Sequence, residues 1–122
     1  EPCRSLLSYF AAFKRPDGLL EKVDEKWNLV DWPGNLRDNY DFPLTIPIGD
    51  GCHNVINAFY VGRVQTLEQI YSELSLDFEP EAEKLKQAYN RCFFRAESGI
   101  YVDSEHSSHA SLHSNCCPPF LG

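Results

Sequence analysis

Residues 53–74, HNVINAFYVGRVQTLEQIYSEL, decide which fold the sequence predicts. Apolar and aromatic side chains recur in this segment at steps of three and four residues, which is the period of one face of an α-helix. The positions on this face are Ile56, Phe59, Tyr60, Arg63, Val64, Leu67, Ile70, Tyr71 and Leu74. The segment therefore predicts a long helix from His53 to Leu74 that packs one face against the rest of the chain.

Further helices are predicted on both sides of this one. Before it, Arg4–Phe13 carries leucine and phenylalanine at helical spacing and is ended by the turn Pro16-Asp17-Gly18. After it, a helix begins near Pro80, because proline suits the first helical position, and Ser98-Gly99 ends it. The residues that we expect this later helix to bury are Ala82, Leu85, Tyr89, Cys92 and Phe93.

Short elements complete the prediction. Gly99–Asp103 is a short extended piece, and Ala110–Cys117 is a last helical segment that Ser107 and Ser108 can cap. Near the N-terminus, the extended runs Leu19–Val23 and Trp27–Trp32 predict a small hairpin around Asp24-Glu25-Lys26. The chain is therefore predicted to be mainly α, built from antiparallel helical hairpins, with a short β-hairpin and a long loop at Pro33–Cys52.

Length and charge limit the possible functions. The chain has 122 residues, enough for one modest core, and a net charge of −7. No basic cluster exceeds Lys14-Arg15, which argues against a nucleic-acid or anionic-membrane partner. No apolar run approaches the length of a membrane span. Because the sequence contains no methionine, we expect it to be part of a longer chain.

Cysteines and histidines do not predict a metal site or a cofactor. The five cysteines match no zinc pattern of paired motifs, so we expect buried free thiols, with a bridge from Cys3 to Cys116 or Cys117 left open. On a helix, His106, His109 and His113 would share one face, which is a possible zinc site. The favoured interpretation is that these histidines form local hydrogen bonds at a helix start.

A candidate binding site lies in the stretch Trp27–Asp41. It combines indoles, carboxylates, a guanidinium and a phenol, and indoles stack on the apolar face of a pyranose while carboxylates accept hydrogen bonds from its hydroxyls. The predicted sugar-binding residues are Asp31, Trp32, Arg37 and Asp38. The alternative interpretation is a loop with a polar face whose two indoles belong to the core.

Several of these segments together resemble the catalytic domain of bacterial α-L-rhamnosidases. The resemblance is carried, in chain order, by Val30-Asp31-Trp32-Pro33, Leu36-Arg37-Asp38, Asn57-Ala58-Phe59-Tyr60, Gly99–Asp103 and His106–Asn115. It implies that the chain is one segment, 1–122, of a larger six-hairpin glycosidase domain folded as an (α/α)6 toroid. The Asp31-Trp32 pair resembles the family's Gly-Asp-Trp element, whose indole lines the sugar pocket, although Val30 replaces the glycine.

The resemblance also implies which parts are missing. Inverting glycoside hydrolysis needs two carboxyl groups about 6.5–9.5 Å apart. The family's acid glutamate lies beside Asp-Cys-Pro and Arg-Glu, and its base glutamate lies near a Trp-Glu pair, and this sequence contains neither motif. No catalytic residue is therefore assigned. The chain is expected to supply part of a wall that binds a rhamnose-containing glycan, in a parent whose location stays open and for which a periplasmic or secreted bacterial enzyme is one expectation.

Two expectations follow for the chain by itself. It should not hydrolyse a glycoside, and it should self-associate, because a segment of a toroid leaves apolar helix faces uncovered. The alternative function is a non-catalytic helical module that uses the same loop for binding or interaction.

Overall fold

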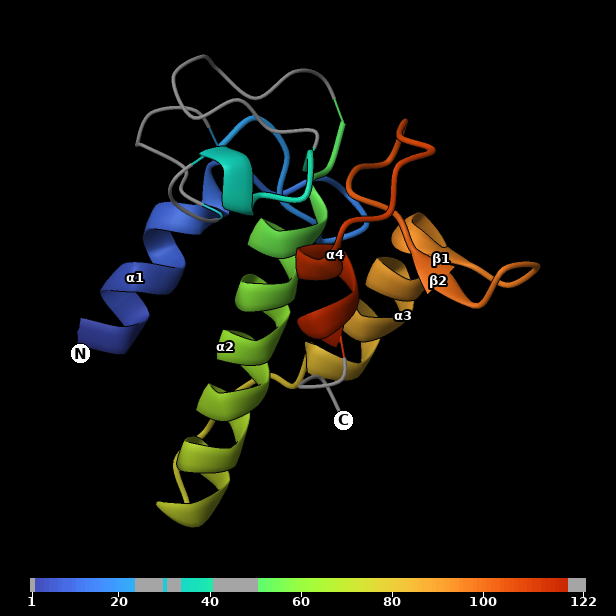
Figure 1. The fold of residues 1–122 in the computed structure, drawn as a ribbon. Coiled ribbons are helices and arrows are strands. Elements are labelled where there is room, and N and C mark those ends of the chain that lie inside the picture. The colour runs from blue at the N-terminus through green and yellow to red at the C-terminus, as the bar shows by residue number, and fades with distance from the viewer. Residues whose placement is uncertain (1, 24–29, 31–33, 41–50, 119–122) are drawn as a thin grey trace.

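The computed structural model describes residues 2–23, 30, 34–40 and 51–118. Its elements in these ranges are the helices α1 (Pro2–Ala11), α2 (Asn54–Glu73), α3 (Ala82–Phe93) and α4 (Leu112–Cys116), the short 3-10 helix η1 (Gly34–Leu36), and the strands β1 (Phe94–Arg95) and β2 (Ile100–Tyr101). Figure 1 shows that α2 and α3 run in opposite directions. The predicted mainly helical class is confirmed.

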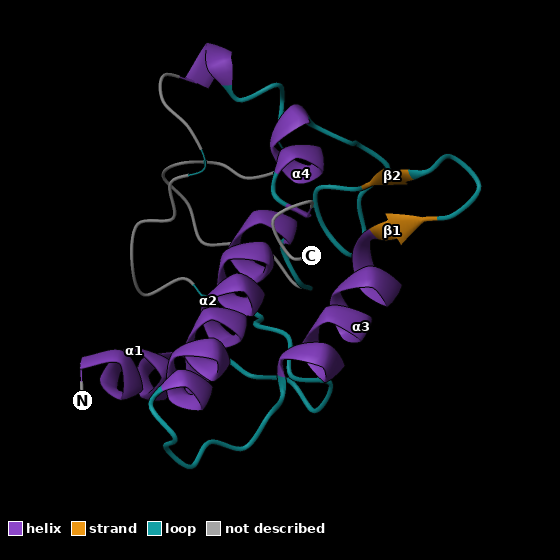
Figure 2. Cartoon of the chain, turned by 90° about the horizontal axis from the view of Figure 1, so that it is seen from below, coloured by secondary structure: helices purple, strands orange, loops and turns teal. Residues whose placement is uncertain are grey.

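Helix α2 is the central element, with α1 on one side and α3 on the other (Figures 1 and 2). Tyr89 and Phe93 of α3 are completely buried, and their ring centroids are 4.9 Å apart. On the other side, the ring of Phe10 in α1 lies 5.7 Å from that of Tyr60 in α2. Aromatic residues from three helices therefore contribute to one core.

The buried face of α2 differs from the predicted one. Phe59 is 72% exposed and Leu74 is 62% exposed, although both were placed on the packed face. The apolar and aromatic side chains that α2 buries are Val55, Ala58, Tyr60, Val61, Val64 and Leu67. The buried face also contains Asn54 and Asn57, because their amides bind backbone groups of other segments. Periodicity correctly placed Tyr60, Val64 and Leu67 on the buried face, but it missed the first turn, where polar residues are buried.

Asn57 attaches the N-terminal segment to α2. Its side chain accepts a hydrogen bond from the Leu20 N–H at 2.7 Å and donates one to the Leu20 carbonyl at 3.0 Å. Because Leu20 is almost fully buried, its backbone groups need such partners. One amide side chain thus satisfies both backbone groups of a core leucine.

The first run of the predicted hairpin, Leu19–Val23, makes its described backbone bridges to other segments. Leu20 makes an isolated bridge to Lys14, and Glu21 makes one to Cys52. Lys22 has a left-handed backbone with φ of 54°, which interrupts an extended run. The predicted partner run, Trp27–Trp32, lies outside the described residues except for Val30.

The small sheet instead follows α3. The helix was predicted to end at Ser98-Gly99, but it ends at Phe93, and the next residues pair with β2 in an antiparallel hairpin. Gly99 stands in the connecting turn with φ of 69°, a left-handed conformation that favours glycine. The rings of Phe94 and Tyr101, which face each other across the hairpin, lie 5.0 Å apart.

Helix α4 is shorter than predicted, and its cap is Ser111 instead of Ser107 or Ser108. The Ser111 side chain accepts a hydrogen bond from the Ser114 N–H, as an N-cap residue does. Of the three histidines, only His113 lies in α4, so they do not share a helical face, and His109 forms the local contact that the favoured interpretation predicts, with Asp103. Asn115 attaches α4 to β2, because its amide pairs with both the N–H and the carbonyl of Tyr101, each at 2.9 Å.

Among the described residues, no helix is both long and apolar enough to cross a membrane.

Candidate functional site

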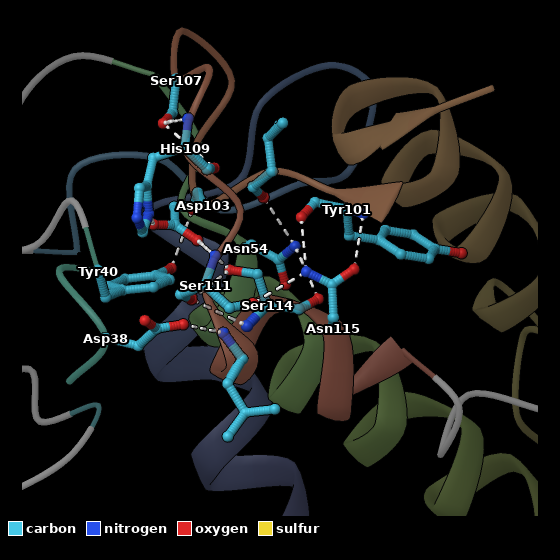
Figure 3. Close-up of polar contacts among 12 residues, drawn as sticks. Asp38, Tyr40, Asn54, Tyr101, Asp103, Ser107, His109, Ser111, Ser114 and Asn115 are labelled. Atoms are coloured by element: carbon cyan, nitrogen blue, oxygen red, sulfur yellow. Dashed lines mark hydrogen bonds and ion pairs between the residues drawn. The ribbon is translucent and has the colours of Figure 1, made fainter. Parts of the chain in front are cut away.

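Two distant segments meet at the N-terminus of α2. The first N–H groups of a helix have no partner inside the helix. Here the Asn54 N–H donates to the Asp103 carbonyl at 2.9 Å, and the Val55 N–H donates to the Tyr40 hydroxyl at 3.1 Å. The Tyr40 hydroxyl in turn donates to the Asp103 carbonyl at 2.9 Å. The start of α2 is therefore capped by groups from outside the helix (Figure 3).

The Asn54 side chain continues this junction into the core. Its amide donates to the Val102 carbonyl at 2.9 Å, and its oxygen accepts a hydrogen bond from the Tyr89 hydroxyl at 2.5 Å. Burial raises the pKa of Tyr40 and of Tyr89 above the ordinary value, so both hydroxyls stay protonated at neutral pH and donate. Asn54 thus joins α2, α3 and the segment before Asp103.

Asp103 is the centre of the polar network in Figure 3. Its side chain is fully buried, and one carboxylate oxygen accepts from the Ser111 N–H at 2.8 Å and from the Ser114 hydroxyl at 2.7 Å. The other oxygen lies 2.6 Å from Nδ1 of His109. Burial raises the pKa of Asp103, but the hydrogen bonds from Ser114, Ser111 and His109 outweigh it, so the net pKa lies below the ordinary value.

His109 is held at the edge of this network. Its side chain is 39% exposed, and the buried carboxylate of Asp103 fixes the ring through Nδ1. A carboxylate in this position fixes the orientation of an imidazole. The pair therefore presents an oriented imidazole at the surface of the junction.

The serines beside this pair have structural roles. The Ser107 hydroxyl accepts from the His109 backbone N–H at 2.8 Å, and the Ser111 and Ser114 hydroxyls lie 3.2 Å from each other. The Ser111 hydroxyl also accepts from the Ser114 N–H at 3.2 Å, so these hydroxyls stabilise the local fold of the segment.

Asp38 joins the predicted sugar-binding segment to the histidine-rich segment. Its carboxylate accepts a hydrogen bond from the Leu112 N–H, at the start of α4, at 2.7 Å. Asp38 and Asn39 both have left-handed backbones, with φ of 49° and 52°, a conformation that these two residue types tolerate better than most. The turn is closed by the Tyr40 N–H, which donates to the Arg37 carbonyl at 2.9 Å.

Arg37 is half-buried beside this turn. Two of its guanidinium nitrogens, Nε and Nη2, are shielded from solvent and have no hydrogen-bond partner among the described residues. Unpaired buried donors are costly and are uncommon in folded proteins. Nε and Nη2 of Arg37 are therefore two buried donors for which the described residues supply no acceptor.

The predicted site residues divide into two groups. Arg37 and Asp38 are described, and Asp38 lies at the junction, whereas Asp31 and Trp32 lie outside the described residues. Prediction of the site omitted Tyr40, Asn54 and Asp103, although they build the junction. A signal was present in the sequence, since two carboxylates, five serines and three histidines cluster in residues 103–114.

The described cysteines are free thiols. Cys52 is buried as expected, but Cys116 is exposed, which contradicts a buried position for it. Because Cys116 and Cys117 are both free, the bridge from Cys3 to either of them is not formed.

Comparisons of the chain with models of known protein families, with curated proteins and with solved structures found no match.

Proposed function

We propose that this chain supplies part of the sugar-binding wall of a glycoside hydrolase that resembles the α-L-rhamnosidases. The observation that carries the proposal is the hydrogen bond between Asp38 and the Leu112 N–H. It joins two segments, Leu36–Asp38 and His106–Asn115, that carry the resemblance in sequence and are far apart along the chain. A site that both segments line would bring them together in this way.

The polar groups at this junction suit a sugar. The Arg37 side chain is half-buried, and the imidazole of His109, which Asp103 orients, is partly exposed. Guanidinium and imidazole groups bind hydroxyl oxygens by directed hydrogen bonds. In the proposal, Asp31 and Trp32 complete the wall, with the Trp32 indole stacked on the apolar face of the ring.

The wider architecture belongs to the same proposal. Antiparallel neighbours such as α2 and α3 are the unit from which an (α/α)6 toroid is built, and further hairpins of the parent would cover the exposed face of α2. The acid and base glutamates would then come from parts of the parent outside these residues. The alternative is a helical interaction module, and the parent gene distinguishes the two, because only a hydrolase encodes both glutamate motifs.

The first prediction concerns sugar binding. In an NMR titration of the chain with L-rhamnose, resonances of Arg37, Asp38 and His109 should shift together with a dissociation constant in the millimolar range. Replacing Arg37 with alanine should weaken binding about tenfold, which corresponds to the loss of roughly 1.4 kcal/mol of hydrogen bonding. Arg91→Ala, on the exposed face of α3, is the matched control and should bind normally.

Hydrolysis is measured in the same preparations. An aryl α-L-rhamnoside should not be turned over above background, because the chain lacks both glutamate motifs. If the unmodified chain hydrolysed the substrate and the Asp38→Asn variant did not, the proposal that the chain binds sugar without catalysing hydrolysis would be wrong. Uniform or absent shifts with L-rhamnose would overturn the proposed sugar site itself.

The second prediction concerns assembly. Phe59 is 72% exposed and Ile70 is 43% exposed on α2, and burial of such surface is worth about 25 cal/mol per Å². Sedimentation velocity at micromolar concentration should therefore show self-association. A Phe59→Ser variant should shift the distribution towards monomer, whereas Thr66→Ser, at an exposed polar position of the same helix, should not. A monomer that Phe59→Ser leaves unchanged would contradict the prediction.

A further inference from the structure

A second cluster of reactive side chains lies apart from the Asp103 network. Cys52 lies two residues before the start of α2, Cys92 lies in the last turn of α3, and Glu105 lies in the segment after β2. One ligand atom from each, two sulfurs and a carboxylate oxygen, lies within 4.8 Å of the others. Cys52 is fully buried and the other two are half-buried, so the fold holds the three groups together in a largely shielded position.

The donor set is that of a zinc-type cation. Zinc binds thiolate at about 2.3 Å and carboxylate oxygen at about 2.0–2.2 Å, in a tetrahedron whose edges are then roughly 3.4–3.8 Å. Donor atoms that lie within 4.8 Å of one another need to move by only about 1 Å to reach those positions. Two thiolates favour a thiophilic metal over Mg²⁺ or Ca²⁺, which prefer oxygen ligands.

The Glu105 carboxylate is already oriented by neighbours. Its Oε2 accepts from Nη1 of Arg15 at 2.5 Å and from the Cys52 N–H at 3.2 Å. Arg15 is itself fixed by Asp17, whose carboxylate lies 2.6 Å from Nη2. Outer hydrogen bonds of this kind are what orient carboxylate ligands in metal sites. Burial raises the pKa of Glu105, but the bonds from Arg15 and Cys52 outweigh it and keep the carboxylate ionised.

Charge balance agrees with a divalent ion. Two thiolates and one carboxylate around a divalent cation leave one negative charge, and the Arg15 guanidinium lies against Glu105 to offset it. Metal ions bind the thiolate form of cysteine, so binding would be accompanied by loss of the thiol proton.

We propose that Cys52, Cys92 and Glu105 form a zinc-binding site, with Arg15 orienting the carboxylate. The fourth tetrahedral position is left for water. The ion would join the segment before α2 to the end of α3 and the loop after β2. Sequence spacing did not predict the site, because its ligands belong to three separate segments.

Cobalt substitution tests the site directly. The full chain, kept reduced, is titrated with Co²⁺, which gives intense near-ultraviolet absorption when thiolates bind it in a tetrahedron. One equivalent should produce this absorption, and added Zn²⁺ should abolish it. Cys92→Ser should weaken Co²⁺ binding by about 100-fold or more, since even the loss of an outer hydrogen bond costs 10–100-fold.

Control variants make the result specific. Cys92 is only half-buried, so its serine variant is preferred to a substitution at fully buried Cys52. Glu105→Gln should weaken Co²⁺ binding about tenfold or more, and Cys116→Ser, at an exposed free cysteine, should bind as the unmodified chain does. Absence of the thiolate absorption, or equal absorption in Cys92→Ser, would overturn the proposal.

Discussion

Replacing Asp103 with alanine should lower the free energy of unfolding by about 4 kcal/mol, one of the two largest effects expected for a single substitution here. The change removes the acceptor for the Ser111 N–H, the Ser114 hydroxyl and Nδ1 of His109. A buried donor left without a partner costs about 1–3 kcal/mol, and Ser111 and Ser114 are both buried. Networks of this kind lose more than one bond at a time.

Urea denaturation measures the loss. Asp77→Ala, at an exposed position between α2 and α3, is the matched control and should change stability by less than about 0.5 kcal/mol. The Asp103→Ala variant should also lose the orientation of His109, visible as a changed chemical shift of its ring protons. If both variants unfold at the same urea concentration, Asp103 does not have the central role assigned to it.

The same residue gives stability a defined pH dependence. The pKa of Asp103 is lower in the folded chain than its ordinary value of 3.8, so the folded state binds this proton less tightly than the unfolded state. The contribution is therefore complete above the ordinary value and is lost as pH falls through the lower, folded pKa. In Asp103→Asn, this part of the acid destabilisation should be absent when urea midpoints are compared from neutral pH downwards.

Replacing Gly18 with alanine should cost about 3 kcal/mol. Gly18 has φ of 92°, and a Cβ there would stand 2.5 Å from Cδ2 of Leu85. A positive φ costs an L-residue about 1–2 kcal/mol, and overpacking a filled core adds about 1–3 kcal/mol. Leu85, in α3, is only 1% exposed and belongs to the hydrophobic core, so its side chain has little room to move away.

Gly99→Ala separates the two causes. Gly99 also has a positive φ, of 69°, but a Cβ there would meet nothing within 4 Å. Its substitution should cost only the backbone part, about 1 kcal/mol. Thermal unfolding of both variants measures the difference. Equal losses would mean that Leu85 yields and that backbone strain alone acts at Gly18.

The sequence by itself determined the helices. The ranges predicted for α1, α2 and α3 overlap the observed elements. The helical period depends only on residues within a few turns of one another, so it can be recognised in the sequence. Tyr89 and Phe93 were correctly assigned to the core for the same reason. The turn at Pro16-Asp17-Gly18 could also be predicted from the local sequence, because these residue types favour the backbone angles of a turn.

Only the tertiary structure decided how these elements meet. Tyr40 and Asp103 cap α2 although they stand 63 positions apart, and Cys52 approaches Cys92 although no spacing motif links them. Which face of α2 is buried also depended on distant partners, because Asn54 and Asn57 are buried to bind backbone groups of other segments. Such pairings depend on chain topology and on satisfying buried polar groups, and neither leaves a periodic signal in the sequence.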